Sequence, residues 1–303
     1  MKNAKKAFTL LELLVVIGIL GLLMSVLVVS VTGGTESARA AECMSNLSSL
    51  AKAVSQQSAA GGGCTLAGSV ETLGFDESQG IRNVKKKYGE KVGWISWNSS
   101  SRYAHGPSSH TSSAGWFTSA YDQDQETRIY CLTNGSLWKY LGGSESIYRC
   151  PNHIKKFPKK RPNWSYVMNS LFGWDQSMGS ESVSEDYRAY NYGELPSPER
   201  HLLFAELQWE NYINENPPKV TASSGKDCDC ILQYRSEDGG EMIGFNHKSG
   251  RDVVAHVAFA DGHVDRIVYP KQGLGGGELR NLTEWLCEGK DYTFDGQRYR
   301  ELK

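Results

Sequence analysis

Residues 1–31 read MKNAKKAFTLLELLVVIGILGLLMSVLVVSV, and this stretch decides which fold to expect. Three lysines lie within residues 1–7, and residues 8–31 contain one charged side chain, Glu12. At about 1.5 Å per helical residue, residues 8–31 reach across the roughly 30 Å hydrocarbon core of a bilayer. The lysines place the N-terminus on the cytoplasmic side. The stretch therefore predicts a single membrane-spanning helix.

Glu12 is not expected in an ordinary membrane anchor, because burying a carboxylate in a membrane helix costs about 2–3 kcal/mol or more. The string KAFTLLE at residues 6–12 resembles the processing site of type IV prepilins and type II secretion pseudopilins. This resemblance implies that a prepilin peptidase cuts between Ala7 and Phe8, that the new N-terminus is methylated, and that Glu12 is retained. The family usually has glycine before the cut, where this chain has Ala7.

The resemblance also implies an assembly role for Glu12. Cleavage frees an α-amine at Phe8, one helical turn from Glu12. Each charge is costly alone in a low dielectric, so the amine of one subunit pairs with Glu12 of a neighbour and sets the register. The implied partners are the prepilin peptidase, sister subunits and the inner-membrane assembly platform. The implied location is the bacterial inner membrane, single-pass with an extracytoplasmic head, and then a periplasmic or cell-surface filament.

Two other targeting segments remain open. A plain signal anchor would keep residues 1–31 in place. A cleaved secretory signal would need a small-x-small site soon after the apolar stretch. Residues 38–40 (Ala-Arg-Ala) offer such a site, although rather far beyond the stretch.

The expected organisation has four parts. They are a leader peptide at residues 1–7, a transmembrane helix at 8–31, an amphipathic stalk helix at 32–60 and a pilin-like globular head at 61–303. Glycine accounts for 32 of 303 residues and aromatic residues for 11%, which favours short strands and loops in the head. The predicted fold class is α+β, with the long N-terminal helix packed on a small antiparallel β-sheet that has long loops.

The stalk helix is predicted from helical spacing of apolar residues. Gly33 and Gly34 are a weak point, since each disfavours a helix by about 1 kcal/mol. Glycines at 61–63 are expected to end the helix. The apolar stripe that would pack on the head consists of Met44, Leu47, Leu50, Ala51 and Val54.

Residues 252–269 (DVVAHVAFADGHVDRIVY) predict a β-hairpin. Alternating apolar residues lead into Asp261-Gly262 and resume after it, and Asp-Gly between alternating segments is a strong signal for a tight type I′ turn. In that register Phe259 faces Val264.

The opposite side of this hairpin would carry His256, His263 and Asp265, with His247 nearby. Their spacing matches no zinc or calcium loop, so neither a metal site nor a cofactor is predicted. Some secretion pseudopilins carry structural calcium, and the resemblance leaves that open here.

A second resemblance covers most of the chain. Several blocks resemble the bacterial family named for a prepilin-type processing-associated H-X9-DG domain, and they occur in family order. The blocks are residues 42–47, 148–151, 165–169, 198–206, 245–247 and 259–264. The implied motif residues are His247, Asp261, Gly262 and His263. His247 lies thirteen residues before Asp261-Gly262 rather than nine, which indicates a longer loop before the strand.

Cysteine content is compatible with export to an oxidising compartment. The chain has seven cysteines, enough for three disulfides with one left over. The expected local pairs are Cys43 with Cys64 and Cys131 with Cys150. Cys228 and Cys230 are too isolated to indicate a metal knuckle or a redox motif.

Charge and motif content exclude several function classes. The chain has 33 basic and 34 acidic residues, and removal of residues 1–7 leaves 30 against 34, a net charge of −4. No basic excess is present for a nucleic-acid partner. Nucleophile-elbow, zinc-protease, P-loop and dinucleotide patterns are all missing, so the protein is expected not to be an enzyme.

A binding role for the head remains the alternative function. Aromatic clusters at residues 94–98, 116–117 and 172–174 could stack on sugar rings or grip a secreted substrate. Several tryptophans on one exposed patch would favour binding, whereas tryptophans buried singly would favour a scaffold.

Overall fold

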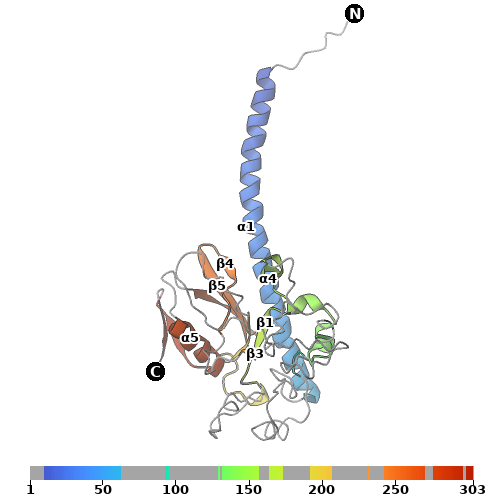
Figure 1. Ribbon diagram of the computed structural model, residues 1–303, viewed down its shortest axis with the longest axis vertical. Coiled ribbons are helices and arrows are strands. Elements are labelled where there is room, and N and C mark those ends of the chain that lie inside the picture. The colour runs from blue at the N-terminus through green and yellow to red at the C-terminus, as the bar shows by residue number, and fades with distance from the viewer. Residues whose placement is uncertain are drawn as a thin grey trace, which may run out of the picture.

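The computed structural model describes ten parts of the chain. These are residues 10–62, 93–95, 129, 132–156, 164–172, 192–206, 231–232, 242–269, 276–295 and 298–302. They form one long helix and a head built around a sheet, so the expected α+β class is observed (Figure 1). The head lies against the second half of the helix, and the first half projects away from it (Figure 1).

Helix α1 (Leu10–Gln57) is continuous over 48 residues, or about 70 Å at 1.5 Å per residue. It passes through Gly33 and Gly34 without a break, so the predicted weak point does not interrupt it. The α-helix ends at Gln57 and continues as a π-helical turn, η1 (Ser58–Gly62), which contains two of the glycines expected to end it, while Gly63 lies outside the described residues. Within the described residues, no helix is both long enough and apolar enough to cross a membrane.

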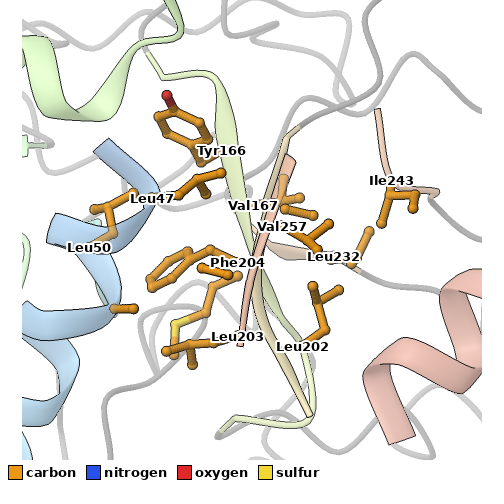
Figure 2. Packing of buried hydrophobic residues seen from close by; sticks show 14 of the residues in the cluster. Leu47, Leu50, Tyr166, Val167, Leu202, Leu203, Phe204, Leu232, Ile243 and Val257 are labelled. Carbon is orange, nitrogen blue, oxygen red and sulfur yellow. The ribbon is translucent and has the colours of Figure 1, made fainter. Parts of the chain in front are cut away.

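The second half of α1 buries one stripe of side chains against the head. Leu47, Leu50, Ala51 and Val54 are buried, as predicted. Met44 is only half-buried, and Cys43 takes the buried position one residue earlier. In Figure 2, Leu47 and Leu50 point from α1 toward the sheet.

The sheet has six strands in the order β3-β1-β2-β5-β4, and β6 also pairs with β5. All pairs are antiparallel except β1 with β3, so the prediction of an antiparallel sheet holds apart from that edge. The strands are β1 (Tyr166–Asn169), β2 (Leu202–Glu206), β3 (Ile231–Leu232), β4 (His247–Ser249), β5 (Asp252–Phe259) and β6 (Val264–Tyr269).

Helices cover both faces of this sheet. Helix α1 lies on one face, where Phe204 points toward it (Figure 2). Helix α5 (Gly276–Glu288) lies on the other, near Leu202, and buries Leu279, Leu282 and Leu286. Because β2 is buried at every position, its residues read as a nearly continuous apolar run rather than an alternating one.

The β5–β6 hairpin forms as predicted, but its register differs by one residue. Ala258, not Phe259, lies opposite Val264. The loop holds three residues between Phe259 and His263, whose backbones hydrogen-bond at 2.9 Å. Gly262 has φ +94°, typical of the left-handed residue that closes a three-residue hairpin loop.

Short elements complete the head. They are the 3₁₀ turns η2 (Trp138–Leu141), η3 (Glu145–Tyr148) and η5 (Tyr192–Glu194), helix α4 (Pro151–Lys156), and a second two-stranded sheet of β7 (Tyr292–Phe294) and β8 (Tyr299–Glu301). Pro151 opens α4, where its missing N–H costs nothing. Cys150 therefore sits immediately before the helix.

Candidate functional site

The predicted processing site lies at the edge of the described chain. Ala7 and Phe8 fall outside the described residues. Glu12 lies in the first turn of α1, and its side chain is exposed. The structure thus places the expected assembly carboxylate near the free end of the projecting helix, away from the head (Figure 1).

Apolar side chains near this end of α1 are exposed rather than packed. Leu10 is 81% exposed, and further residues as far as Leu20 remain 44% or more exposed. They are Leu13, Leu14, Val15, Val16, Ile17, Ile19 and Leu20. Because they occur on all sides of the helix, this segment needs an apolar environment supplied from outside the head.

A second candidate site lies where α1 meets the sheet, and strand register explains how it forms. Phe204 faces α1, and Glu206 lies two residues further along β2, so both side chains share that face. Tyr166 lies directly opposite Glu206 on β1 and faces α1 as well.

Strands β5 and β4 bring two histidines to the same face. Ala258 lies opposite Phe204, and His256 lies two residues before Ala258. His247 lies opposite Val254, which is two residues before His256. Both rings therefore point toward α1, with their centroids 4.4 Å apart.

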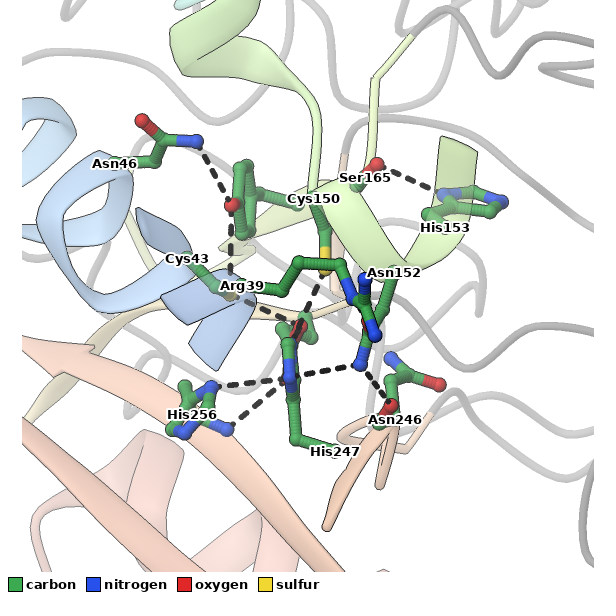
Figure 3. A network of polar contacts seen from close by, with 12 residues as sticks. Arg39, Cys43, Asn46, Cys150, Asn152, His153, Ser165, Asn246, His247 and His256 are labelled. Atoms are coloured by element: carbon green, nitrogen blue, oxygen red, sulfur yellow. Dashed lines mark hydrogen bonds and ion pairs between the residues drawn. The ribbon is translucent and has the colours of Figure 1, made fainter. Parts of the chain in front are cut away.

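Four of the side chains in this region form one buried cluster, referred to below as the four-residue cluster: Cys43, Cys150, Glu206 and His247. Their sulfur, nitrogen and oxygen atoms all lie within 4.8 Å of one another. Glu206 Oε1 is 3.1 Å from Cys43 Sγ and 2.9 Å from His247 Nε2. The same ring nitrogen is 3.2 Å from Cys150 Sγ (Figure 3).

A hydrogen bond from Tyr166 on β1 holds Cys43 in place, and Asn46 on α1 extends this network. The Tyr166 hydroxyl donates to Cys43 Sγ at 3.4 Å. Asn46, one turn along α1, contacts that hydroxyl at 3.5 Å and donates to the carbonyls of Ser146 and Arg149 at 3.3 and 3.2 Å. The helix is thereby tied to the turn that precedes Cys150.

An outer group of polar side chains surrounds His247. Asn152 on α4 accepts from Arg39 Nε at 2.7 Å and donates to Glu36 Oε1 at 2.7 Å. Its amide nitrogen lies 3.0 Å from His247 Nδ1, and Glu36 Oε1 lies 3.7 Å from the same atom. Both nitrogens of the ring therefore have fixed neighbours (Figure 3).

Burial and the charge of the partner shift the pKa values of Glu206 and His247 in opposite directions. Burial alone would lower the pKa of His247, but the carboxylate of Glu206 raises this pKa to about 10. Burial alone would raise the pKa of Glu206, but the His247 ring keeps it below its ordinary value. Both effects favour an ion pair, which reduces the cost of two charges in the interior.

The pKa values of the neighbouring side chains, Cys43, Cys150 and His256, shift in different directions. Burial raises the pKa of the Cys43 thiol well above its ordinary value. Burial also opposes ionisation of Cys150, but hydrogen bonds to Cys43 and His247 lower the pKa of this thiol. Burial lowers the pKa of His256 to about 4, so this ring is neutral beside the pair.

The expected disulfides, Cys43 with Cys64 and Cys131 with Cys150, stay predictions, because Cys64 and Cys131 lie outside the described residues. Within the described part, Cys43 and Cys150 are both free and buried. Their thiols lie beside Glu206 and His247 in the interior.

The residues expected from the H-X9-DG resemblance, His247, Asp261, Gly262 and His263, do not lie together in one site. His247 is buried in the four-residue cluster, whereas Asp261 and Gly262 form the hairpin loop at the far end of β5. The His263 side chain is 44% exposed and stacks on Phe259. The predicted face shared by His256, His263 and Asp265 is also not observed, because Arg266 and not Asp265 lies opposite the buried His256.

The aromatic residues that the structure describes belong mostly to the core. Trp94 is buried and packs on Tyr148 and Phe204, with ring centroids 5.8 and 5.0 Å away. Trp164 and Phe172 are also buried. The other tryptophans of the predicted binding clusters, at positions 97, 116 and 174, lie outside the described residues. The described part therefore gives the binding role no exposed aromatic patch.

Sequence reasoning missed the roles of Glu206, Tyr166 and Asn152. A signal for Glu206 was present, because a carboxylate ends the apolar run Leu-Leu-Phe-Ala of a strand that is buried on both faces. Tyr166 and Glu206 also lie in the sequence blocks at 165–169 and 198–206. Each of these two blocks contributes one polar side chain to the same region, as do the blocks holding Cys43, Cys150 and His247.

Comparisons with known proteins identify the N-terminus alone. The prokaryotic N-terminal methylation motif matches residues 2–28. No curated protein and no solved structure matches the chain. The motif supports a pilin-like protein that is processed by a prepilin peptidase, and it contains the predicted residues Ala7, Phe8 and Glu12.

Proposed function

We propose that this chain is a non-enzymatic pilin or pseudopilin subunit that assembles into a type IV pilus-like or type II secretion filament. Processing would remove residues 1–7 and methylate Phe8. The mature chain would wait in the inner membrane, with its head outside the cytoplasm, until an assembly platform adds it to sister subunits. The matching methylation motif and the shape of α1 both support this proposal.

The exposed apolar end of α1 is the observation that carries the proposal. A helix that is apolar on all sides is normally surrounded by other helices or by lipid. Leu10 and Leu20 are 81% and 52% exposed, and the head does not cover the segment between them. A filament core made of sister helices, or a membrane before assembly, would supply the missing apolar neighbours.

Glu12 gives the assembly a defined register. Its side chain is exposed on the isolated chain but would be surrounded by apolar helices in a filament. A carboxylate in that environment is costly unless a cation approaches it, and the α-amine created at Phe8 supplies one. Pairing the amine of one subunit with Glu12 of the next favours a single axial offset.

Processing is tested by intact mass and N-terminal sequencing of the chain recovered from membranes of a host with a prepilin peptidase. We expect a chain that begins at methylated Phe8. Replacing Ala7 with a bulky charged residue, Ala7→Arg, should leave the leader attached. A wild-type chain that still begins at Met1 would overturn the proposal.

Assembly is tested with Glu12→Gln. We expect this variant to be cleaved normally but to be lost from sheared filaments, because the neutral amide cannot pair with the amine. Glu42→Gln is the matched control, since Glu42 is an exposed carboxylate on the same helix within the head region. Equal filament incorporation of the Glu12→Gln variant and wild type would refute the assembly role.

A further inference from the structure

We propose that the four-residue cluster binds a zinc ion in tetrahedral coordination and thereby fastens α1 to the head. The ligand atoms would be Sγ of Cys43, Sγ of Cys150, Nε2 of His247 and Oε1 of Glu206. They come from four separate elements: α1, the residue before α4, β4 and β2. This site goes beyond the filament role and does not depend on it.

The spacing of the four atoms fits one small cation. Zinc bonds of about 2.0–2.3 Å give a tetrahedron with edges of about 3.3–3.8 Å. The Glu206 oxygen lies 3.1 and 2.9 Å from Cys43 Sγ and His247 Nε2, and Cys150 Sγ lies 3.2 Å from that nitrogen. These three pairs would need to separate by about half an ångström to reach the tetrahedral edges, and no pair of the four atoms is more than 4.8 Å apart.

The donor set favours zinc over harder ions. Two thiolates, one imidazole and one carboxylate are ligand types that zinc takes in tetrahedral sites, whereas calcium and magnesium prefer oxygen ligands in larger numbers. All four side chains are buried, which is typical of a closed structural site rather than a catalytic one with an open position. Coordination requires both thiols, and Nε2 of the ring, to give up their protons.

The surroundings of His247 fit a metal ligand. A histidine that binds zinc through one ring nitrogen normally donates its other N–H to a carboxylate or a carbonyl, which fixes the ring. His247 Nδ1 lies 3.0 Å from the amide nitrogen of Asn152 and 3.7 Å from Glu36 Oε1, which is itself held by Asn152 at 2.7 Å. An amide nitrogen cannot accept the Nδ1–H, so with zinc on Nε2 the ring would shift slightly to donate to Glu36, and Glu36 would act as a positioning residue.

A disulfide between the two thiols is the main competing outcome. Such a bond would use Cys43 and Cys150 alone, and it would not explain why His247 and Glu206 converge on the same point. With zinc bound, both sulfurs would be thiolates committed to the ion. The two outcomes differ by the metal content of the protein and by the mass of the cysteine peptides.

The first measurement uses the full chain purified in detergent under reducing conditions, without chelator. We expect about one zinc per chain by elemental analysis, and X-ray absorption should give two sulfur and two nitrogen or oxygen neighbours. Replacement with cobalt should produce thiolate charge-transfer bands and the visible absorption of a tetrahedral ion. A chain without zinc that also fails to bind added zinc or cobalt would overturn the proposal, as would a Cys43–Cys150 disulfide in protein isolated from its native compartment.

Variants locate the ion. Cys43→Ser and His247→Gln should each abolish stoichiometric zinc, whereas Cys287→Ser should keep it, because Cys287 is another buried free cysteine on α5 outside the cluster. Zinc retained in the Cys43→Ser variant would assign the metal to other cysteines and refute the site.

A milder variant tests the positioning residue without removing a ligand. Glu36→Gln should weaken zinc binding by about 10–100-fold in competition with a chelator. The control Glu42→Gln, an exposed position on the same helix, should leave it unchanged. Equal affinities for Glu36→Gln and wild type would contradict the positioning role of Glu36.

Discussion

Glu206 shows how one residue can determine both the packing and the chemistry of the head. Its side chain is fully buried, and its two oxygens have different tasks. Oε1 lies beside Cys43 and His247, while Oε2 accepts from the backbone N–H of His256 at 3.2 Å. The central strand therefore ends in a carboxylate whose partners come from other elements on both sides.

We expect Glu206→Ala to destabilise the reduced, chelator-treated chain by about 3–5 kcal/mol, because it leaves the His247 charge and a buried N–H without the carboxylate. Denaturant unfolding gives this value. Glu199→Ala is the control, since Glu199 is 54% exposed and its contact with Arg200 is worth at most about 1 kcal/mol. Similar losses in the two variants would contradict the interpretation of Glu206 as a buried ion-pair partner.

Position 289 requires glycine for two reasons: its backbone is left-handed, and the His201 ring lies too close to leave room for a Cβ. It follows α5 with φ +67°, and a Cβ built there would lie 2.5 Å from the His201 ring. That ring is held by a 2.8 Å contact between Nδ1 and the Ser197 carbonyl. We expect Gly289→Ala to cost about 3 kcal/mol, against about 1 kcal/mol for Gly142→Ala, which has φ +64° and open space. Thermal unfolding of both variants measures the difference, and equal shifts would show that the ring moves freely.

Secondary structure was predictable where the spacing of apolar residues along the chain determines it. The apolar period of α1 and the alternation around Asp261-Gly262 gave the helix and the hairpin. The hairpin register was predicted wrongly by one residue, because a loop of three residues with a single left-handed glycine satisfies the same sequence as a two-residue turn. The glycine pair in α1 did not break the helix, since two unfavourable residues are a small cost over 48.

Strand β6 lies at the edge of the sheet, and the second small sheet protects it. The Tyr299 hydroxyl on β8 donates to the Val268 carbonyl at 2.7 Å and accepts from the Val268 N–H at 3.1 Å. It thus satisfies both backbone groups of one edge residue, where another chain would otherwise pair.

We expect Tyr299→Phe to make amide exchange at Val268 about tenfold faster, because the lost hydrogen bonds are worth about 1.4 kcal/mol. The phenylalanine ring keeps the packing on Phe294, whose centroid is 4.5 Å away. Hydrogen exchange resolved to the β6 peptide is the measurement. Tyr292→Phe, which leaves the Tyr299 hydroxyl in place, serves as control, and unchanged exchange in both variants would refute the edge-protecting role.

At the scale of the whole molecule, the four-residue cluster could not be predicted from local pattern. Cys43 and Glu206 are 163 residues apart, and Cys150 and His247 are 97 apart. These four residues come together only because of the order of the strands and the face of the sheet that α1 covers. Sequence reasoning paired Cys43 with Cys64 and Cys150 with Cys131, which are near each other along the chain, whereas the fold brings Cys43 and Cys150 into one cluster. The sequence blocks supplied the right residues without the geometry that joins them.

The molecule divides at about residue 35 into a projecting helix and a self-contained head. Leu10 and the apolar residues from Leu13 to Leu20 are exposed, and the ties from α1 to the head include Glu36 to Asn152 at 2.7 Å and Asn46 to the Arg149 carbonyl at 3.2 Å. We therefore expect a chain of residues 35–303 to be soluble without detergent and to unfold within about 2 °C of the full chain, a difference below about 1 kcal/mol.

A shorter chain of residues 45–303 provides the contrast. It lacks Glu36 and Cys43, so it loses both the outer contact to Asn152 and one member of the four-residue cluster. We expect its unfolding midpoint to fall by about 5 °C or more, because several buried polar groups lose their partners at once. Scanning calorimetry of the three chains under reducing conditions makes the comparison. A large loss already in residues 35–303 would show that the head depends on the projecting half of α1, which would contradict the division into an assembly helix and an independent head.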